Sequence, residues 1–229
     1  MINKLKGYLT ILQMIITVSI VIILMFLFRD KNHYIRQKWA KLQMILLGIE
    51  LDIQGEPDLE ANMLMINHQS VLDIIILEYL YSKNISWIAK KEIGDIPWFG
   101  NILKLPNMIQ VQRESKSSLV KLLKDSKIAL DDNRPIAIFP EGTRSKTIKL
   151  RKFKVGAKII AEKFNLKVQP IILIGTGDLF DSKNLIQQSG KVIVKYLPSI
   201  QAEKKSSWWD DTQTLMNQEY QKGLEEYDI

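Results

Sequence analysis

The chain has 229 residues, a formal net charge of +7 at pH 7 and no cysteine. The lack of cysteine excludes disulfides, thiolate metal ligands and a cysteine nucleophile. The positive charge favours an anionic partner, which could be a phosphate-bearing substrate, an acidic membrane surface or nucleic acid, although a solvated basic surface would carry the same charge.

The first predicted element is an apolar stretch, residues 8–28, that carries no charged side chain. As a helix it would be about 31 Å long, close to the roughly 30 Å of a bilayer's hydrocarbon core. More lysine and arginine side chains follow it than precede it, which predicts that the main domain faces the cytoplasm. We expect residues 1–49 to form a membrane anchor, either as a spanning helix or as a hairpin that enters one leaflet.

The second part of this anchor, residues 34–49, has the pattern of a basic amphipathic helix. Ile35, Trp39, Leu42, Ile45, Leu46 and Ile49 can share one face, with Arg36, Lys38 and Lys41 away from it. A helix of this kind suits the interface of an anionic bilayer.

From residue 50 onward, short apolar runs alternate with helical patterns. Strands are predicted at residues 51–54, 62–66, 86–89, 108–112, 136–139, 168–174 and 192–196. Helices are predicted at residues 71–81, 97–103, 116–130, 154–164 and 209–226. This alternation predicts an α/β fold, with a central, mostly parallel or mixed sheet flanked by helices. No repeat or linker divides the region, so residues 50–229 are interpreted as one domain.

One of the two histidines, His68, is predicted to lie in the loop between the strand at 62–66 and the helix at 71–81. Asp73 falls in the first turn of that helix. Because His68 precedes the helix, the chain can fold back and bring the carboxylate to one ring nitrogen, leaving the other to accept a proton. The pair is therefore a candidate general base with its orienting partner; the alternative is a loop histidine and an ordinary capping aspartate.

A second candidate stretch, residues 139–145, follows the strand at 136–139, at the end where ligands usually bind in α/β folds. Gly142 allows close approach of a ligand to the backbone, and Arg144 offers a planar donor group suited to phosphate. Arg113 follows the strand at 108–112 in the same way. A charged surface turn is the alternative interpretation of each.

Motifs of several other enzyme classes are absent from the sequence. It contains no phosphate loop, no GxGxxG, no GxSxG and no HExxH, which argues against the usual NTPases, dinucleotide enzymes, esterases and zinc proteases.

Taken together, the motifs resemble those of the glycerolipid acyltransferases, the PlsC-like family that includes 1-acylglycerol-3-phosphate acyltransferases. Asn67, His68 and Asp73 match N-H-x-x-x-x-D, and residues 139–145 read F-P-E-G-T-R-S. A looser segment that ends at Arg113 and a strand with Pro170 resemble the other two family motifs. The resemblance covers about residues 54–196, and the first and third motifs in this order are its most specific part.

The resemblance implies an enzyme of phospholipid biosynthesis. It would transfer an acyl chain from acyl-CoA or acyl-carrier protein to the sn-2 hydroxyl of lysophosphatidic acid and form phosphatidic acid, without a cofactor or a metal. Its partners would be these substrates and an anionic membrane, but no nucleic acid. The alternatives are an acyltransferase for another lysolipid, and a membrane lipid-binding protein of the same fold without turnover.

The resemblance also assigns residues. It implies that His68 and Asp73 are the catalytic pair, and that the phosphate and glycerol site is formed by Arg113, Glu141, Gly142, Thr143 and Arg144. A phosphate should repel Glu141, so we expect this carboxylate to orient Arg144 or to accept a hydrogen bond from the acceptor hydroxyl.

Overall fold

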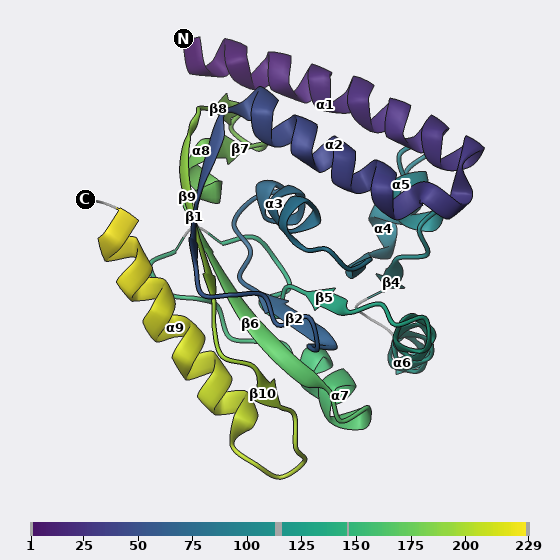
Figure 1. Cartoon of the computed structure of the whole chain (residues 1–229), viewed down its shortest axis with the longest axis vertical. Coiled ribbons are helices and arrows are strands. Elements are labelled where there is room, and N and C mark those ends of the chain that lie inside the picture. Colours follow the sequence, from purple (N-terminus) through teal and green to yellow (C-terminus); the bar gives the residue numbers. More distant parts are fainter. Residues whose placement is uncertain (1, 113–115, 146, 228–229) are drawn as a thin grey trace.

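The computed structural model describes residues 2–112, 116–145 and 147–227 (Figure 1). The strands are β1 (Ile49–Gln54), β2 (Met63–Ile66), β3 (Ser86–Lys90), β4 (Ile109–Val111), β5 (Ile136–Ile138), β6 (Lys167–Ile174), β7 (Phe180–Asp181), β8 (Ile186–Gln187), β9 (Gly190–Tyr196) and β10 (Ile200–Gln201). The helices are α1 (Ile2–Leu27), α2 (Asn32–Leu47), α3 (Leu72–Leu80), α4 (Lys91–Gly94), α5 (Asn101–Lys104), α6 (Lys116–Asp131), α7 (Val155–Lys163), α8 (Thr176–Leu179) and α9 (Trp208–Tyr227), with a 3-10 turn, η1, at Arg29–Lys31.

The central sheet is mixed, which confirms the predicted α/β fold. Its strand order is β1-β9-β6-β2-β5-β3-β4, and β10 also pairs with β6. Strands β6, β2, β5, β3 and β4 run parallel in succession, whereas β9 and β10 are antiparallel to β6. The carboxyl ends of β6, β2 and β5 therefore meet at one edge of the sheet.

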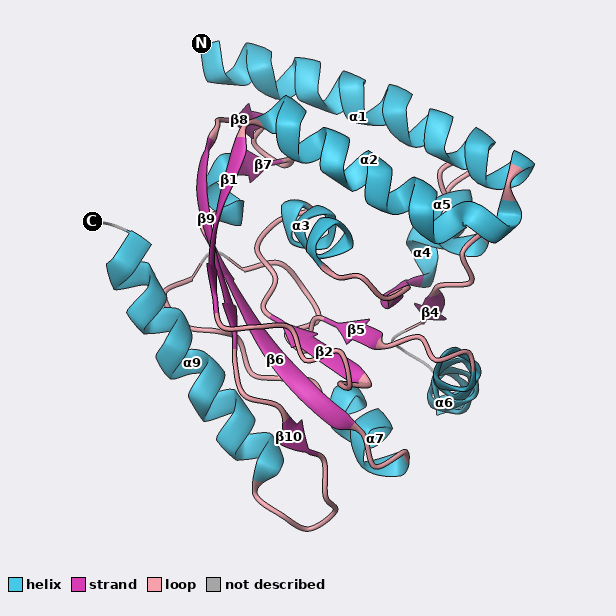
Figure 2. Ribbon diagram, viewed as in Figure 1, coloured by secondary structure: helices cyan, strands magenta, loops and turns pink. Residues whose placement is uncertain are grey.

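Both faces of the sheet are covered, because successive side chains of a strand point to opposite faces. Leu64 and Ile66 of β2 belong to a core shared with α2 and α3. Met63 and Met65 belong to a second core shared with α6, α7 and α9. Figure 2 shows these layers, with α1 to α3 on one side of the strands and α7 and α9 on the other.

The two N-terminal helices form a hairpin that packs on the first face of the domain (Figure 1). One side of α1 packs on the domain: Gly7, Thr10, Val21, Ile22 and Met25 are buried. Thr17 in its middle is half-buried and accepts hydrogen bonds from Trp39 Nε1 at 3.0 Å and Gln43 Nε2 at 3.2 Å. At its start, a Cβ atom at Gly7 would lie 1.9 Å from the Leu185 carbonyl oxygen. Helix α1 is therefore part of the folded domain and does not project from it.

The prediction for α2 was wrong in one respect. Arg36 was expected on the polar face of an interfacial helix, but it is buried and forms an ion pair with Glu78 at the end of α3. Trp87 Nε1 donates to the same Glu78 carboxylate at 2.7 Å. An arginine can be buried when a carboxylate and hydrogen bonds compensate for lost hydration, which a helical pattern alone does not reveal.

The predicted helix at residues 97–103 was only partly correct, since its last residues belong to α5 while its first residues form the turn between α4 and α5. Trp98 has φ 66°, which a continuous right-handed helix does not permit. The short elements β7, β8, β10 and α8 were not predicted, because segments of two to four residues carry too little hydrophobic periodicity.

Candidate active site

Three loops meet where the parallel strands β2, β5 and β6 end. His68 follows β2, Glu141 follows β5, and Thr176 follows β6. Because β2 lies between β5 and β6 with parallel pairing on both sides, these loops emerge at the same edge of the sheet. His68 and Glu141 were each predicted in a loop that follows a strand. Because the two strands are parallel neighbours, these loops lie side by side.

His68 and Asp73 are in direct contact. His68 Nδ1 lies 2.7 Å from Asp73 Oδ2. A carboxylate can only accept at this position, so Nδ1 carries the proton and Nε2 is the nitrogen that can take a proton from a substrate. The His68 side chain is 13% exposed and that of Asp73 is fully buried, so the imidazole can be reached only from one side.

Asp73 is held by several donors besides His68. Its Oδ2 also accepts the backbone N–H groups of Gln69 at 2.7 Å and Ser70 at 2.9 Å. Its Oδ1 accepts the hydroxyl of Thr176. Helix α3 begins at Leu72, one residue later than predicted. Before it, the Ser70 hydroxyl donates to the Phe180 carbonyl at 2.6 Å. These bonds keep an ionised carboxylate in place inside the protein.

The loop around His68 is fixed from both neighbouring strands. The Asn67 side chain exchanges two hydrogen bonds with the backbone of Leu173, at 2.8 and 2.7 Å, and so extends the pairing of β2 with β6. On the other side, Ser145 N donates to the His68 carbonyl at 2.8 Å. The imidazole stacks on Phe139, with ring centroids 3.8 Å apart. Little movement is left to the histidine.

Glu141 is buried beneath the same loop. Its Oε1 accepts His68 N at 3.0 Å and its Oε2 accepts Arg151 N at 2.9 Å. Burial raises the pKa of Glu141, and the two backbone donors oppose that shift. The carboxylate thus joins the His68 loop to the loop after β5, and neither of these two bonds involves Arg144 or an acceptor hydroxyl.

The described residues that remain of the predicted phosphate site lie at or near the surface, on the loop after β5. Thr143 and Arg144 are exposed, and Gly142 has φ 72°, a left-handed conformation that favours glycine. Arg144 Nη1 donates to Ser182 Oγ at 3.1 Å, in the turn between β7 and β8. Arg113 lies outside the residues that the structure describes.

Sequence reasoning missed two side chains that support the catalytic loop. Thr176 donates to Asp73, and Gln69 Nε2 donates to the Tyr220 hydroxyl of α9 at 2.7 Å. The position of Thr176 just after a buried strand could have indicated its place in the site, because the motif with His68 and the motif at residues 139–145 follow strands in the same way. Nothing in the sequence pairs Gln69 with Tyr220.

A cavity of about 560 Å³ opens beside Gln69, between the loop after β5 and helices α8 and α9. Thr147, Asp178 and Tyr220 are among the residues that line it. Across the described ranges of the chain, no three histidine, aspartate or glutamate side chains are grouped closely enough to hold a metal ion.

Comparison with known proteins gives consistent matches. The model of the family described as Acyltransferase matches residues 52–174. The chain is 41% identical to the 1-acyl-sn-glycerol-3-phosphate acyltransferase of Helicobacter pylori, over 98% of both chains. It is 33% identical to the protein of the same name from Cocos nucifera, over 72% of this chain and 54% of that relative.

Among solved structures, the fold is similar to the crystal structure of the 1-acyl-sn-glycerophosphate acyltransferase PlsC from Thermotoga maritima. The TM-score is 0.76 at 23% identity, and the match covers 100% of this chain and 95% of that one. This likeness includes the N-terminal helices, because it extends over the whole chain.

Proposed function

Because this chain belongs to the acyltransferase family, we propose that it transfers an acyl chain from a thioester to the sn-2 hydroxyl of 1-acylglycerol 3-phosphate and forms phosphatidic acid. The observation that carries the proposal is the His68–Asp73 pair, with Nδ1 on the carboxylate. The relatives named for this reaction support the choice of acceptor.

In the proposed mechanism, His68 Nε2 removes the proton from the sn-2 hydroxyl, and Asp73 stabilises the imidazolium that forms. The resulting oxygen nucleophile attacks the thioester carbonyl. The tetrahedral intermediate then expels the thiolate, which takes the proton from His68. The phenyl ring of Phe139 and the bonds to Asp73 keep the imidazole oriented for both proton transfers.

The acceptor's phosphate is assigned to Arg144. This side chain is exposed at the site edge, and its acceptor there is the neutral hydroxyl of Ser182, which a phosphate can replace with a stronger, bidentate contact between opposite charges. Gly142 and Thr143 precede it on the same loop, and Arg113 is proposed as a second phosphate ligand on the basis of the family motif alone. We assign Glu141 to holding the loops together.

The donor is proposed to be acyl-CoA or acyl-carrier protein. Both present the acyl group as a thioester, which supplies the leaving group for this reaction. The chain's own residues provide the base and the acceptor site, and the proposal requires no metal or redox cofactor.

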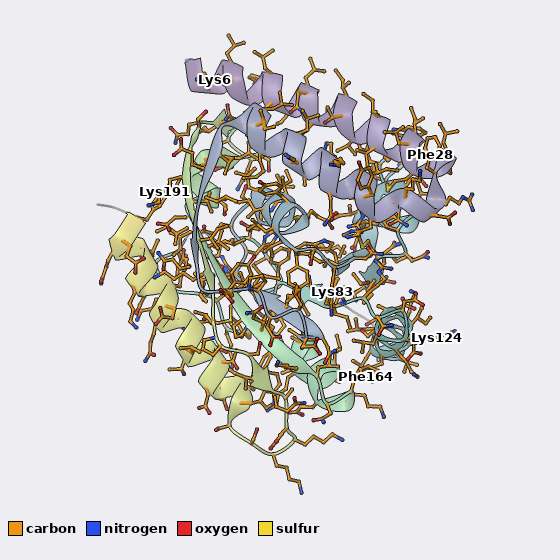
Figure 3. All side chains as sticks on the ribbon, viewed as in Figure 1. Lys6, Phe28, Lys83, Lys124, Phe164 and Lys191 are labelled. Atoms are coloured by element: carbon orange, nitrogen blue, oxygen red, sulfur yellow. The ribbon has the colours of Figure 1, made fainter. Side chains whose placement is uncertain are left out.

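The chain associates with membranes through α1, whose segment Leu5–Leu27 contains an 18-residue window with a mean hydropathy of 2.7. We propose that α1 lies along one leaflet and does not cross the bilayer. One side of α1 packs on the domain from Gly7 to Met25, whereas its other side exposes leucine, isoleucine and phenylalanine. Lys6 and Phe28 mark the two ends of this surface in Figure 3. A crossing helix would have to give up the packed side.

This placement relates the phosphate site to the bilayer. The turn between β7 and β8 touches α1 at Gly7 through Leu185 and binds Arg144 through Ser182. Arg144 is therefore tied to the start of the membrane helix, where a lysolipid headgroup would lie. We also propose a cytoplasmic position for the domain, because a chain whose N-terminal helix does not cross the bilayer stays on the side where it is synthesised.

The test is thiol release from an acyl thioester by the detergent-solubilised protein, with and without 1-acylglycerol 3-phosphate. Wild type should release thiol only with the lysolipid, and His68→Ala should lose roughly 10²–10⁴-fold in rate while its thermal unfolding shows that it remains folded at the assay temperature. Thiol release without acceptor would instead indicate a thioesterase. No release with several lysolipids and both donors would indicate a binding protein.

A further inference from the structure

The turn between β3 and α5 exposes three large apolar side chains within six residues. Ile93 is 43% exposed, Ile96 47% and Trp98 44%. Single exposed apolar residues are common, but a cluster next to another apolar surface commonly marks an interaction site. We call residues 93–98 the apolar turn.

The backbone of the apolar turn holds Trp98 outward. Trp98 has φ 66°, a conformation that costs an L-residue other than glycine on the order of 1 kcal/mol or more. The surroundings enforce it: Asn101 Nδ2 donates to the Trp98 carbonyl at 2.9 Å, and a Cβ atom at Gly100 would lie 2.0 Å from the Gly94 carbonyl oxygen. These contacts hold the backbone at Trp98, and the direction of its indole is set by a hydrogen bond of the ring nitrogen.

That direction leads to the outer face of α1. Trp98 Nε1 donates to Ser19 Oγ at 3.1 Å. Residues three or four apart share one face of a helix, so Ser19 belongs with Ile15, Ile16 and Ile23, which are 45%, 52% and 46% exposed. The indole thus lies among the exposed apolar side chains of α1, and the apolar turn continues that surface.

We propose that the apolar turn enters the same leaflet as α1 and forms a second membrane contact of the catalytic domain. This rests on the membrane placement of α1 proposed above. The Trp98 N–H already has its acceptor on α1, so the indole carries no unsatisfied donor into the lipid. Lys91 and Asp95, which flank Ile93 and are 51% and 59% exposed in their side chains, would lie at the level of the headgroups.

A second contact has a mechanical consequence. If α1 alone contacted the leaflet, the attached domain could roll about the axis of that helix. The apolar turn lies to one side of the carboxyl-terminal half of α1, beside α4 and α5 (Figure 1). Contact there would prevent the roll and hold the active-site edge at a constant height above the acyl chains.

The natural absence of cysteine makes a direct test simple. Single cysteines at Ile93→Cys and Ile96→Cys would each carry a nitroxide spin label, with Ile16→Cys on α1 as the lipid reference. The matched control is Val120→Cys, an apolar residue that is 71% exposed on α6, a helix that lies away from α1 (Figure 1). Each full-length protein is reconstituted in vesicles of phosphatidylethanolamine and phosphatidylglycerol after its acyl transfer has been verified.

The measurement compares collisions of each label with oxygen, which concentrates in lipid, and with a water-soluble nickel chelate. Labels at positions 93 and 96 should match position 16, with high oxygen and low nickel accessibility, whereas position 120 should be open to nickel. If nickel reached positions 93 and 96 as well as it reaches position 120 while position 16 stayed protected, this proposal would be overturned and the membrane placement of α1 would stand. Nickel accessibility at position 16 as well would overturn the membrane placement of α1 and this proposal with it.

Discussion

Replacing Asp73 by asparagine removes the carboxylate charge while preserving the shape of the side chain. Oδ2 accepts N–H groups from His68, Gln69 and Ser70. An amide NH₂ group at this position would face three donors, so the asparagine must keep its carbonyl oxygen there. The Thr176 hydroxyl can then turn and accept a bond from the NH₂ group. We therefore expect the fold and the imidazole tautomer to survive in Asp73→Asn.

The loss in rate follows from the missing charge. With 2.7 Å between Nδ1 and Oδ2, the centres of the imidazolium and carboxylate charges would be about 4 Å apart. At an effective dielectric constant of about 20, such a pair attracts by about 4 kcal/mol. If the imidazolium is nearly formed in the transition state, this corresponds to a decrease in kcat of about 10³-fold.

The assay is thiol release at saturating lysolipid and donor, together with thermal unfolding. The control is Asp131→Asn on α6, which makes the same change in net charge at an exposed ion pair. A folded Asp73→Asn protein whose kcat lies within tenfold of wild type would refute the argument, because the carboxylate charge would then not be assisting the base.

Four further outcomes are expected. Thr176→Val should lower kcat, and Thr176→Ser should restore it, because only the hydroxyl reaches Asp73; equal activity of both variants would remove Thr176 from the site. Arg144→Ala should raise the KM for 1-acylglycerol 3-phosphate but not for a monoacylglycerol, and a parallel rise for both would argue against a phosphate contact. Glu141→Gln should lower the melting temperature and kcat together, since its NH₂ group would face the N–H of either His68 or Arg151; an unchanged melting curve would contradict the assigned role. Burial lowers the pKa of His33 below its usual 6.5. The unfolded chain therefore binds a proton at His33 more tightly than the folded chain does, and the free energy of unfolding falls as the pH drops below about 6.5. His33→Gln should flatten that decline in thermal melts between about pH 7 and about pH 5, and an identical decline in the variant would exclude His33 as its cause.

The helices and strands of ordinary length were predictable because their apolar residues repeat with the period of the element. The predicted strand at 168–174 corresponds to β6, and the predicted helix at 209–226 to α9. The contact of His68 with Asp73 was predictable for a related reason. Both residues lie in one strand–loop–helix unit, so local geometry brings them together without help from the rest of the fold.

Contacts between distant segments could not be read in this way. The family resemblance implied that Glu141 belongs to the phosphate and glycerol site, and the tertiary structure adds that its oxygens accept the backbone amides of His68 and Arg151. Arg36 looked like a solvated interfacial residue until its ion pair with Glu78 was seen. In both cases the charged side chain could lie on the surface or in the interior, and the position of its partner in the fold determines which.

The sequence by itself therefore determined the family motifs, the α/β alternation and the presence of an apolar N-terminal helix, since each is written in local composition and spacing. Only the tertiary structure decided that α1 packs along the domain, that Thr176 supports Asp73, and that Trp98 reaches Ser19 on α1. The last two contacts join residues 103 and 79 positions apart. Their partners are selected by the order of strands in the sheet and by complementary burial, which no single stretch of the chain contains.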